Sequence, residues 1–185
     1  ILGNVIELTV KGGGFEASAK LKRAEAVAAL AAAGISKFDT NLSPEARVRE
    51  SNVAARVVSE TATDRFLRFA SKSRVLWVDD RPQNNVLERR SLEALGIEFA
   101  ISTSTDDALA TLKTERFDLI ISDMGRPPDP CAGYTLLDSL RGGNNQTPLI
   151  IYAGSSAPEH DAETRRRGGI GCTNRPEELF QMVIR

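Results

Sequence analysis

The 185-residue sequence is poor in the residues that form covalent frameworks and soft-metal sites. It has two cysteines, one histidine, one tryptophan and two tyrosines. Cys131 and Cys172 are too few for a disulfide framework. The single histidine, His160, cannot build a metal site alone and lies in a polar stretch, where a surface position is expected. A disulfide-stapled fold is therefore excluded, and the cytoplasm is the default location.

Long apolar runs are also missing. The most apolar window, Ala26 to Ile35, has about half of the ~20 residues that a membrane-spanning helix needs. No signal peptide is recognisable, and the sequence opens at Ile1 rather than Met, so a trimmed chain is expected. The apolar fraction of 41% and the charged fraction of 26% are typical of a soluble globular protein.

The two parts of the chain differ in charge. Residues 1–74 hold 12 Lys and Arg against 8 Asp and Glu, a net of +4, whereas residues 75–185 hold 12 against 17, a net of −5. Two interpretations of the basic arm stay open: a solvated surface, or an arm at the inner face of a membrane, behind a tether N-terminal to this chain. The first 70 residues show no basic recognition helix, so no nucleic-acid partner is expected.

Residues 1–42 are predicted to form a hairpin and a helix. Ile6, Leu8 and Val10 alternate with polar residues before the glycines of residues 12–14, and the alternation resumes at Phe15. This pattern is typical of two short strands around a turn. A phosphate-binding loop is disfavoured because no Lys-Ser or Lys-Thr follows the glycines. A helix is expected over residues 18–33, ending at Gly34.

Residues 43–73 are predicted to be a linker or signalling helix. Ser43, Pro44 and Glu45 form a helix start, and apolar residues at helical spacing continue to about Ala70. One periodic face does not name its partner, so a homodimer through the 43–70 helix and packing on its own domain both stay open. A polar joint at residues 71–74 is taken as the boundary to a domain of residues 74–185.

Residues 74–185 alternate regularly between strand and helix patterns. Five apolar strand segments are each followed by a helical pattern, at residues 75–78, 99–102, 117–122, 149–152 and 170–172. Such alternation predicts an α/β fold with a five-stranded, doubly wound parallel sheet.

Carboxylates follow two of these strands. Asp79 and Asp80 come directly after the first strand, and Asp123 follows the third. If the two strands are parallel neighbours, the three side chains meet at the carboxyl edge of the sheet, where such sheets bind ligands. Three carboxylates at close range repel each other, and a hard divalent cation is the usual compensation.

This combination resembles the receiver domain of bacterial response regulators, which has a flavodoxin-like fold. The resemblance implies that Asp123 accepts a phosphoryl group from a histidine kinase or phosphotransfer protein. It also implies that Asp79, Asp80, Asp123 and the carbonyl of Gly125 hold Mg²⁺, and Pro127 matches a proline of the family. A carboxylate is a competent nucleophile for such a transfer.

The sequence departs from the family in the residues that read out phosphorylation. Tyr152 stands where the fourth strand should end in Ser or Thr, Arg175 replaces the lysine that pairs with the phosphoryl oxygens, and Cys172 replaces the aromatic switch residue. The loop after Asp123 also looks longer than usual. We expect Tyr152 and Arg175 to reshape the phosphoryl pocket, so that phosphorylation is long-lived or weakly coupled to the switch.

Three functions are compatible with these residues. The leading hypothesis is an atypical receiver that binds Mg²⁺, is phosphorylated on Asp123 and changes its interaction with a partner. The alternative is a pseudo-receiver, a protein-interaction module independent of phosphorylation. An aspartate-nucleophile phosphatase ranks last, because that family needs Asp-x-Asp after its first strand and this chain has Asp79-Asp80-Arg81. A signalling domain rather than an enzyme is therefore expected.

Overall fold

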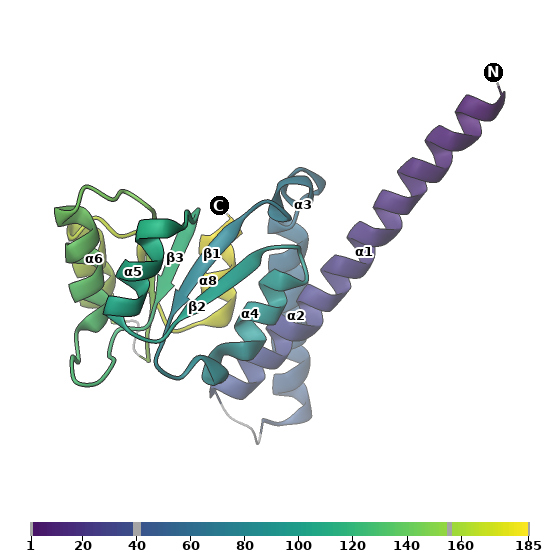
Figure 1. Cartoon of the computed structure of the whole chain (residues 1–185). Helices are drawn as coiled ribbons and strands as arrows, with labels where there is room; N and C mark the ends of the chain where they lie inside the picture. The colour runs from purple at the N-terminus through teal and green to yellow at the C-terminus, as the bar shows by residue number, and fades with distance from the viewer. Residues whose placement is uncertain (1, 39–41, 155–156, 185) are drawn as a thin grey trace.

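A five-stranded, wholly parallel sheet forms the centre of the molecule (Figure 1). The computed structural model describes residues 2–38, 42–154 and 157–184. The strand order is β2-β1-β3-β4-β5. The strands are β1 (Arg74–Val78), β2 (Glu98–Ser102), β3 (Leu119–Ser122), β4 (Leu149–Tyr152) and β5 (Gly171–Thr173). The predicted doubly wound parallel sheet is thus confirmed, and β1 and β3 are neighbours at its switch point.

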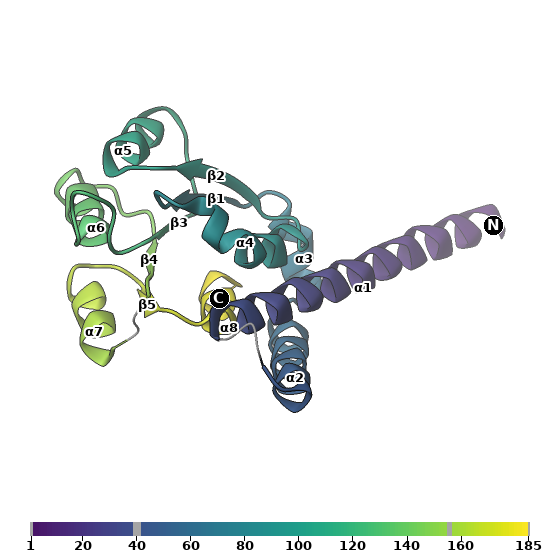
Figure 2. The same cartoon turned by 90° about the horizontal axis from the view of Figure 1, so that it is seen from below.

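Helices cover both faces of the sheet (Figure 2). One face carries α5 (Thr105–Thr114), α6 (Ala132–Gly142) and α7 (Pro158–Arg166). The other carries α4 (Val86–Glu93), which follows the short 3₁₀ helix η1 (Pro82–Asn85), and α8 (Pro176–Ile184). Two buried apolar clusters, one on each face, hold these layers together.

The N-terminal region is helical throughout. Helix α1 spans Leu2–Phe38, so the predicted hairpin over residues 4–20 is wrong. The Ala-rich stretch that follows the glycines has strong helix propensity and buries Ala19, Ala26 and Leu30 on one side. Once that part is helical, each further residue adds a hydrogen bond without a new nucleation cost. Helix propagation therefore prevails over the short period-two pattern and the local cost of the glycines.

The predicted single helix from Ser43 to about Ala70 is two helices. α2 (Pro44–Thr61) begins where expected, and the Ser43 hydroxyl accepts a hydrogen bond from the Ala46 N–H at 3.3 Å. α3 (Asp64–Ala70) has its own cap, because the Thr63 hydroxyl accepts from the Phe66 N–H at 3.2 Å. A capping threonine followed by an acidic first turn starts a new helix, which explains the break.

The N-terminal helices share an apolar cluster with the sheet. Ala26 and Leu30 of α1 and Val57 of α2 belong to the same buried cluster as Trp77 of β1 and Phe180 of α8. The buried side of α2 therefore packs within its own chain. None of the helices in the described ranges combines the length and apolar content needed to cross a bilayer.

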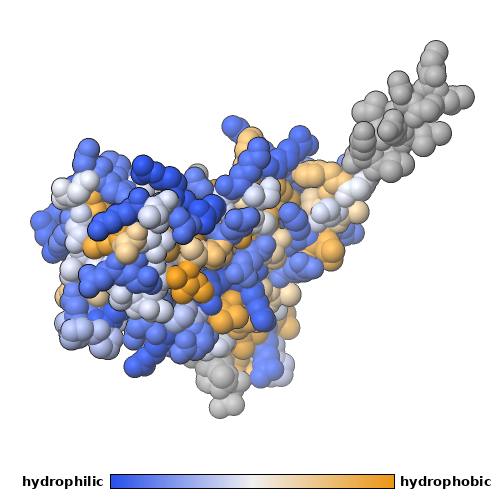
Figure 3. Space-filling view, in the orientation of Figure 1, coloured by the Kyte–Doolittle hydropathy of each residue, from blue (hydrophilic) through white to orange (hydrophobic). Residues whose placement is uncertain are grey.

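The visible surface is mainly hydrophilic, with apolar residues in small separate patches (Figure 3). Among the described side chains, the large apolar ones that are exposed are Leu21, Val48, Phe69 and Ile101. Single exposed apolar residues are common on the surfaces of folded proteins.

We expect Leu30→Ala to lower the free energy of unfolding by roughly 2–5 kcal/mol, because it opens a cavity in the shared cluster. Leu30 is 2% exposed. The matched control is Leu21→Ala on the same helix, where the side chain is 61% exposed and a change below about 0.5 kcal/mol is expected. Urea unfolding followed by the fluorescence of Trp77, which is 1% exposed, measures both. Equal effects of the two substitutions would show that α1 is not part of the core.

Candidate functional site

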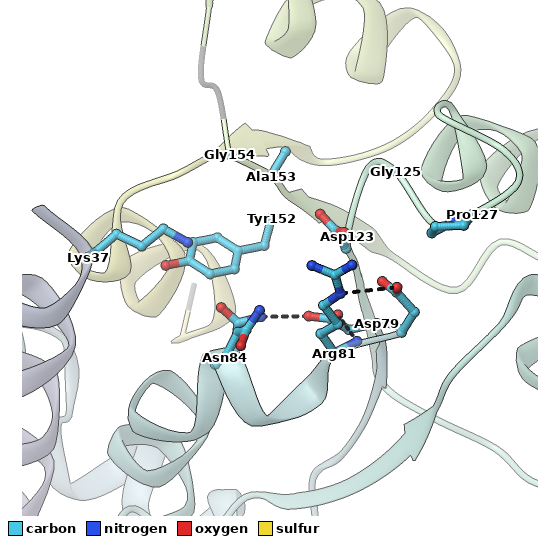
Figure 4. Close-up of a pocket in the computed structure, with 12 residues that line it drawn as sticks. Lys37, Asp79, Arg81, Asn84, Asp123, Gly125, Pro127, Tyr152, Ala153 and Gly154 are labelled. Carbon is cyan, nitrogen blue, oxygen red and sulfur yellow. Dashed lines mark hydrogen bonds and ion pairs between the residues drawn. The ribbon is translucent and has the colours of Figure 1, made fainter.

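Neighbouring strand ends bring the three predicted carboxylates together. The ladder between β1 and β3 continues one step beyond β3, since the Asp123 N–H donates to the Val78 carbonyl at 2.9 Å. Asp79, Asp80 and Asp123 thereby each place a carboxylate oxygen within 4.8 Å of the others. The convergence expected from the sequence is present in the structure. Figure 4 shows Asp79 and Asp123 in the cavity at these strand ends.

Asp79 is the fixed member of the group. It is 4% exposed, and its two oxygens accept hydrogen bonds from the Arg81 N–H at 2.7 Å and from the Asn85 side chain at 2.6 Å. Asp80 is partly buried, and the Arg81 Nε lies 3.7 Å from its carboxylate. The 3₁₀ turn after β1 therefore orients one carboxylate rigidly and leaves the other nearer to solvent.

Asp123 has an environment that disfavours its charge. Burial raises the pKa of Asp123 above its usual value, and the charges of Asp79 and Asp80 raise it further. A hydrogen bond from the Met124 N–H, at 2.7 Å, acts in the opposite direction. A cation bound among the three carboxylates would remove this penalty.

The donor set suits a hard divalent cation. The three carboxylates line a cavity of about 350 Å³ together with Gly125, whose carbonyl the family resemblance assigns to the metal. Oxygen-only ligands and room for water fit Mg²⁺, which keeps several of its waters. Asp79, Asp80, Asp123 and Gly125 are therefore the residues that would hold the ion.

Arg126, which the sequence analysis did not single out, holds the loop after β3 from inside. Its guanidinium is buried and donates to the Ser122 hydroxyl at 2.8 Å, the Asp123 carbonyl at 2.7 Å and the Thr105 hydroxyl at 3.0 Å. It also donates to the carbonyl of Ala132, at the start of α6, at 3.0 Å. Burial lowers the pKa of Arg126, and the nearby carboxylates oppose that shift. Its charge partly offsets theirs.

Tyr152 lies beside Asp123 but turns its hydroxyl away from it. Ser122 pairs with Ile151 in the β3–β4 register, so Asp123 and Tyr152 stand at the next level on the same face of the sheet. The Tyr152 hydroxyl donates to Glu88 of α4 at 2.9 Å. Burial, followed by the charge of Glu88, raises the pKa of Tyr152, which therefore stays protonated.

Arg175 is not among the residues that line this cavity. Its guanidinium pairs with Glu177, where the Nε–Oε1 distance is 2.6 Å, and lies 3.6 Å from Glu178. Instead, Lys37 at the end of α1 lines the cavity, with its ammonium 4.5 Å from the centre of the Tyr152 ring. Sequence patterns carry no signal for this contact, because Lys37 belongs to a distant helix.

Comparison with known proteins agrees with this geometry. The sequence profile described as the response regulator receiver domain matches residues 75–183, more than half of the chain. The sensor protein EvgS of Escherichia coli is 29% identical over 114 residues, which cover 61% of this chain and 9% of EvgS. The virulence sensor protein BvgS of Bordetella pertussis is 31% identical over 110 residues, covering 56% of this chain and 9% of BvgS. The match thus spans less than a tenth of these relatives.

Solved structures agree with the sequence matches. The chemotaxis response regulator CheY4 of Vibrio cholerae is 27% identical, with a TM-score of 0.52 over 60% of this chain and 95% of that one. A Francisella receiver domain, 24% identical, shows the same fold with a TM-score of 0.54 over 60% of this chain and 93% of its own. The chain belongs to the response regulator receiver domain family, and its helices α1, α2 and α3 precede the matched region.

Proposed function

We propose that this receiver domain binds Mg²⁺ and accepts a phosphoryl group on Asp123, which changes its interaction with a partner. The observation that carries the proposal is the convergence of three carboxylates within 4.8 Å at the carboxyl ends of β1 and β3. Their mutual repulsion costs free energy of folding, and a bound cation would offset it. Clustered carboxylates of this kind are typical of functional sites.

The transfer is a substitution at phosphorus. A carboxylate oxygen of Asp123 attacks the phosphorus of a phosphohistidine, an O–P bond forms, and the P–N bond to the imidazole breaks. The imidazole leaves with the electron pair of that bond and takes up a proton. When bound, Mg²⁺ supplies positive charge next to the transferring oxygens. The hydrogen bonds from the Arg81 N–H and the Asn85 side chain keep the Asp79 carboxylate in the orientation in which it would bind the metal.

A histidine kinase or phosphotransfer protein is the proposed phosphoryl donor. Support comes from the relatives, which are named as sensor proteins, a sensor histidine kinase and a nitrogen assimilation regulatory protein. Each is longer than the matched segment, so the activity of a larger protein containing this chain belongs to the proposal.

The second candidate is an interaction module that works without phosphorylation. It is favoured by the readout residues: Tyr152 is bonded to Glu88, and the charge of Arg175 is engaged by Glu177. The polar partners of these two side chains in the described residues are therefore glutamates and not Asp123. The readout of a phosphoryl group would require a contact with the group on Asp123.

Phosphorylation is tested with acetyl phosphate and Mg²⁺, read by intact mass. We expect the wild-type chain to gain one phosphoryl group and Asp123→Asn to gain at least tenfold less, because an amide is not a nucleophile for this transfer. Glu159→Gln, which changes an exposed acid of α7, is the control and is expected to label like the wild type. Equal labelling of Asp123→Asn would remove Asp123 as the acceptor, and no labelling of any variant would favour the interaction module.

Metal binding is tested by titrating Mg²⁺ against the fluorescence of Trp77, two residues before Asp79. Asp80→Ala is expected to weaken binding at least tenfold, about 1.4 kcal/mol, because it removes one of three anionic ligands. Glu159→Gln again serves as the control for a general loss of negative charge. A wild-type chain that does not respond to millimolar Mg²⁺ would contradict the metal site.

A further inference from the structure

We propose that Lys37 of α1, a residue outside the receiver segment, is the cation that pairs with the phosphoryl group on Asp123. The end of α1 would then respond directly to phosphorylation. This inference rests on the proposed function and assigns to it a residue that the receiver segment itself does not contain.

Position is the first argument. Lys37 lines the same cavity as Asp79, Asp80 and Asp123. Its side chain extends from α1 to the Tyr152 ring (Figure 4). Tyr152 and Asp123 occupy adjacent strands at the same level, about 5 Å apart at the backbone. A phosphoryl group would lengthen the Asp123 side chain into the cavity that Lys37 also lines.

Energetics give the second argument. Lys37 now rests on the Tyr152 ring, and a cation–π contact of this exposed kind is worth roughly 0.5–1 kcal/mol. Phosphorylation adds about one more negative charge than the free carboxylate carries and offers several acceptor oxygens. Charge-assisted hydrogen bonds to such oxygens are about twice as strong as neutral ones. Lys37 therefore gains by moving from the ring to the phosphoryl group.

The other nearby cations are already engaged. Arg175 pairs with Glu177 and Glu178, and its side chain is 51% exposed. The buried Arg126 is occupied by hydroxyl and carbonyl oxygens of the loops. Arg81, the other cation among the described residues that line the cavity, forms an ion pair with Asp80 at 3.7 Å. Lys37 also lines the cavity, and its ammonium lies over the face of the Tyr152 ring. Among the described residues, no hydrogen bond or ion pair joins Lys37 to a carboxylate.

The consequence concerns α1. This helix packs on α2, α4 and α8 through buried residues such as Ala26 and Leu30, while Lys37 stands in its last turn. A shift of Lys37 toward Asp123 pulls on that turn and thereby couples the phosphoryl site to the N-terminal helix.

The test uses the full chain with Mg²⁺ and beryllofluoride, a stable mimic of the phosphoryl group. Beryllofluoride affinity is measured by ¹⁹F NMR for wild type, Lys37→Met and Lys20→Met, the last removing an exposed lysine of the same helix. We expect Lys37→Met to weaken binding about tenfold and Lys20→Met to stay within twofold. Arg175→Met and Arg81→Met are measured as rivals, and a loss confined to either of them overturns the proposal.

A second readout follows Lys37 itself. In lysine-labelled protein, the ε-methylene signal that is absent from Lys37→Met identifies this residue. Its ring-current shift from Tyr152 is expected to disappear when beryllofluoride binds. An unchanged shift together with unchanged affinity of Lys37→Met overturns the inference while leaving phosphorylation of Asp123 intact. A wild-type chain that binds no beryllofluoride overturns the proposed function, and the inference with it.

Discussion

Repulsion among Asp79, Asp80 and Asp123 is the constraint on which the rest of the site depends. Adjacent parallel strands, β1 and β3, end at the same level and force the three carboxylates together. Hydrogen-bond donors of the surrounding structure partly offset this repulsion. The Arg81 N–H and the Asn85 amide donate to Asp79, and the Met124 N–H donates to Asp123. The buried charge of Arg126 adds a further offset. These donors orient the carboxylates without neutralising them, which preserves a site suited to a divalent cation.

The sheet and the carboxylate cluster could be predicted because their causes are local. A strand buried on both faces is a short apolar run, and such runs at residues 75–78 and 117–122 predicted β1 and β3, the second of which begins at Leu119. The order of strand and helix segments then implied parallel neighbours, and parallel neighbours place Asp79 and Asp123 at one edge. Each step used only the residues next to it in the sequence and one general rule of topology.

The first part of α1 and the surroundings of Tyr152 could not be predicted, because their causes are distant in sequence, whereas the start of α2 at Ser43 was predicted. The hairpin pattern of residues 4–20 gave way to a helix whose stability comes from packing Ala26 and Leu30 on other elements. The hydrogen bond between Tyr152 and Glu88 spans 64 positions, and Lys37 reaches Tyr152 from a helix outside the receiver segment. Local propensity carries no information about such contacts, and tertiary packing decides them.

The departures from the family at Tyr152 and Arg175 are compatible with a single change in the source of positive charge. Glu177 and Glu178 engage Arg175, so the fifth strand offers no free cation to the cavity in this arrangement. Tyr152, held by Glu88, presents a ring face to the Lys37 ammonium in the cavity that the carboxylates also line. A hydrogen bond from the Tyr152 hydroxyl to a carboxylate enriches the ring in electrons and so strengthens its attraction for a cation. Under the role proposed for Lys37, the tyrosine that stands in place of the usual Ser or Thr is also the residue that positions the replacement charge. Decay of an unused site would not require the pairing of Arg175 with glutamates and the contact of Lys37 with Tyr152 to occur together. A cation supplied by α1 in place of the fifth strand would require both.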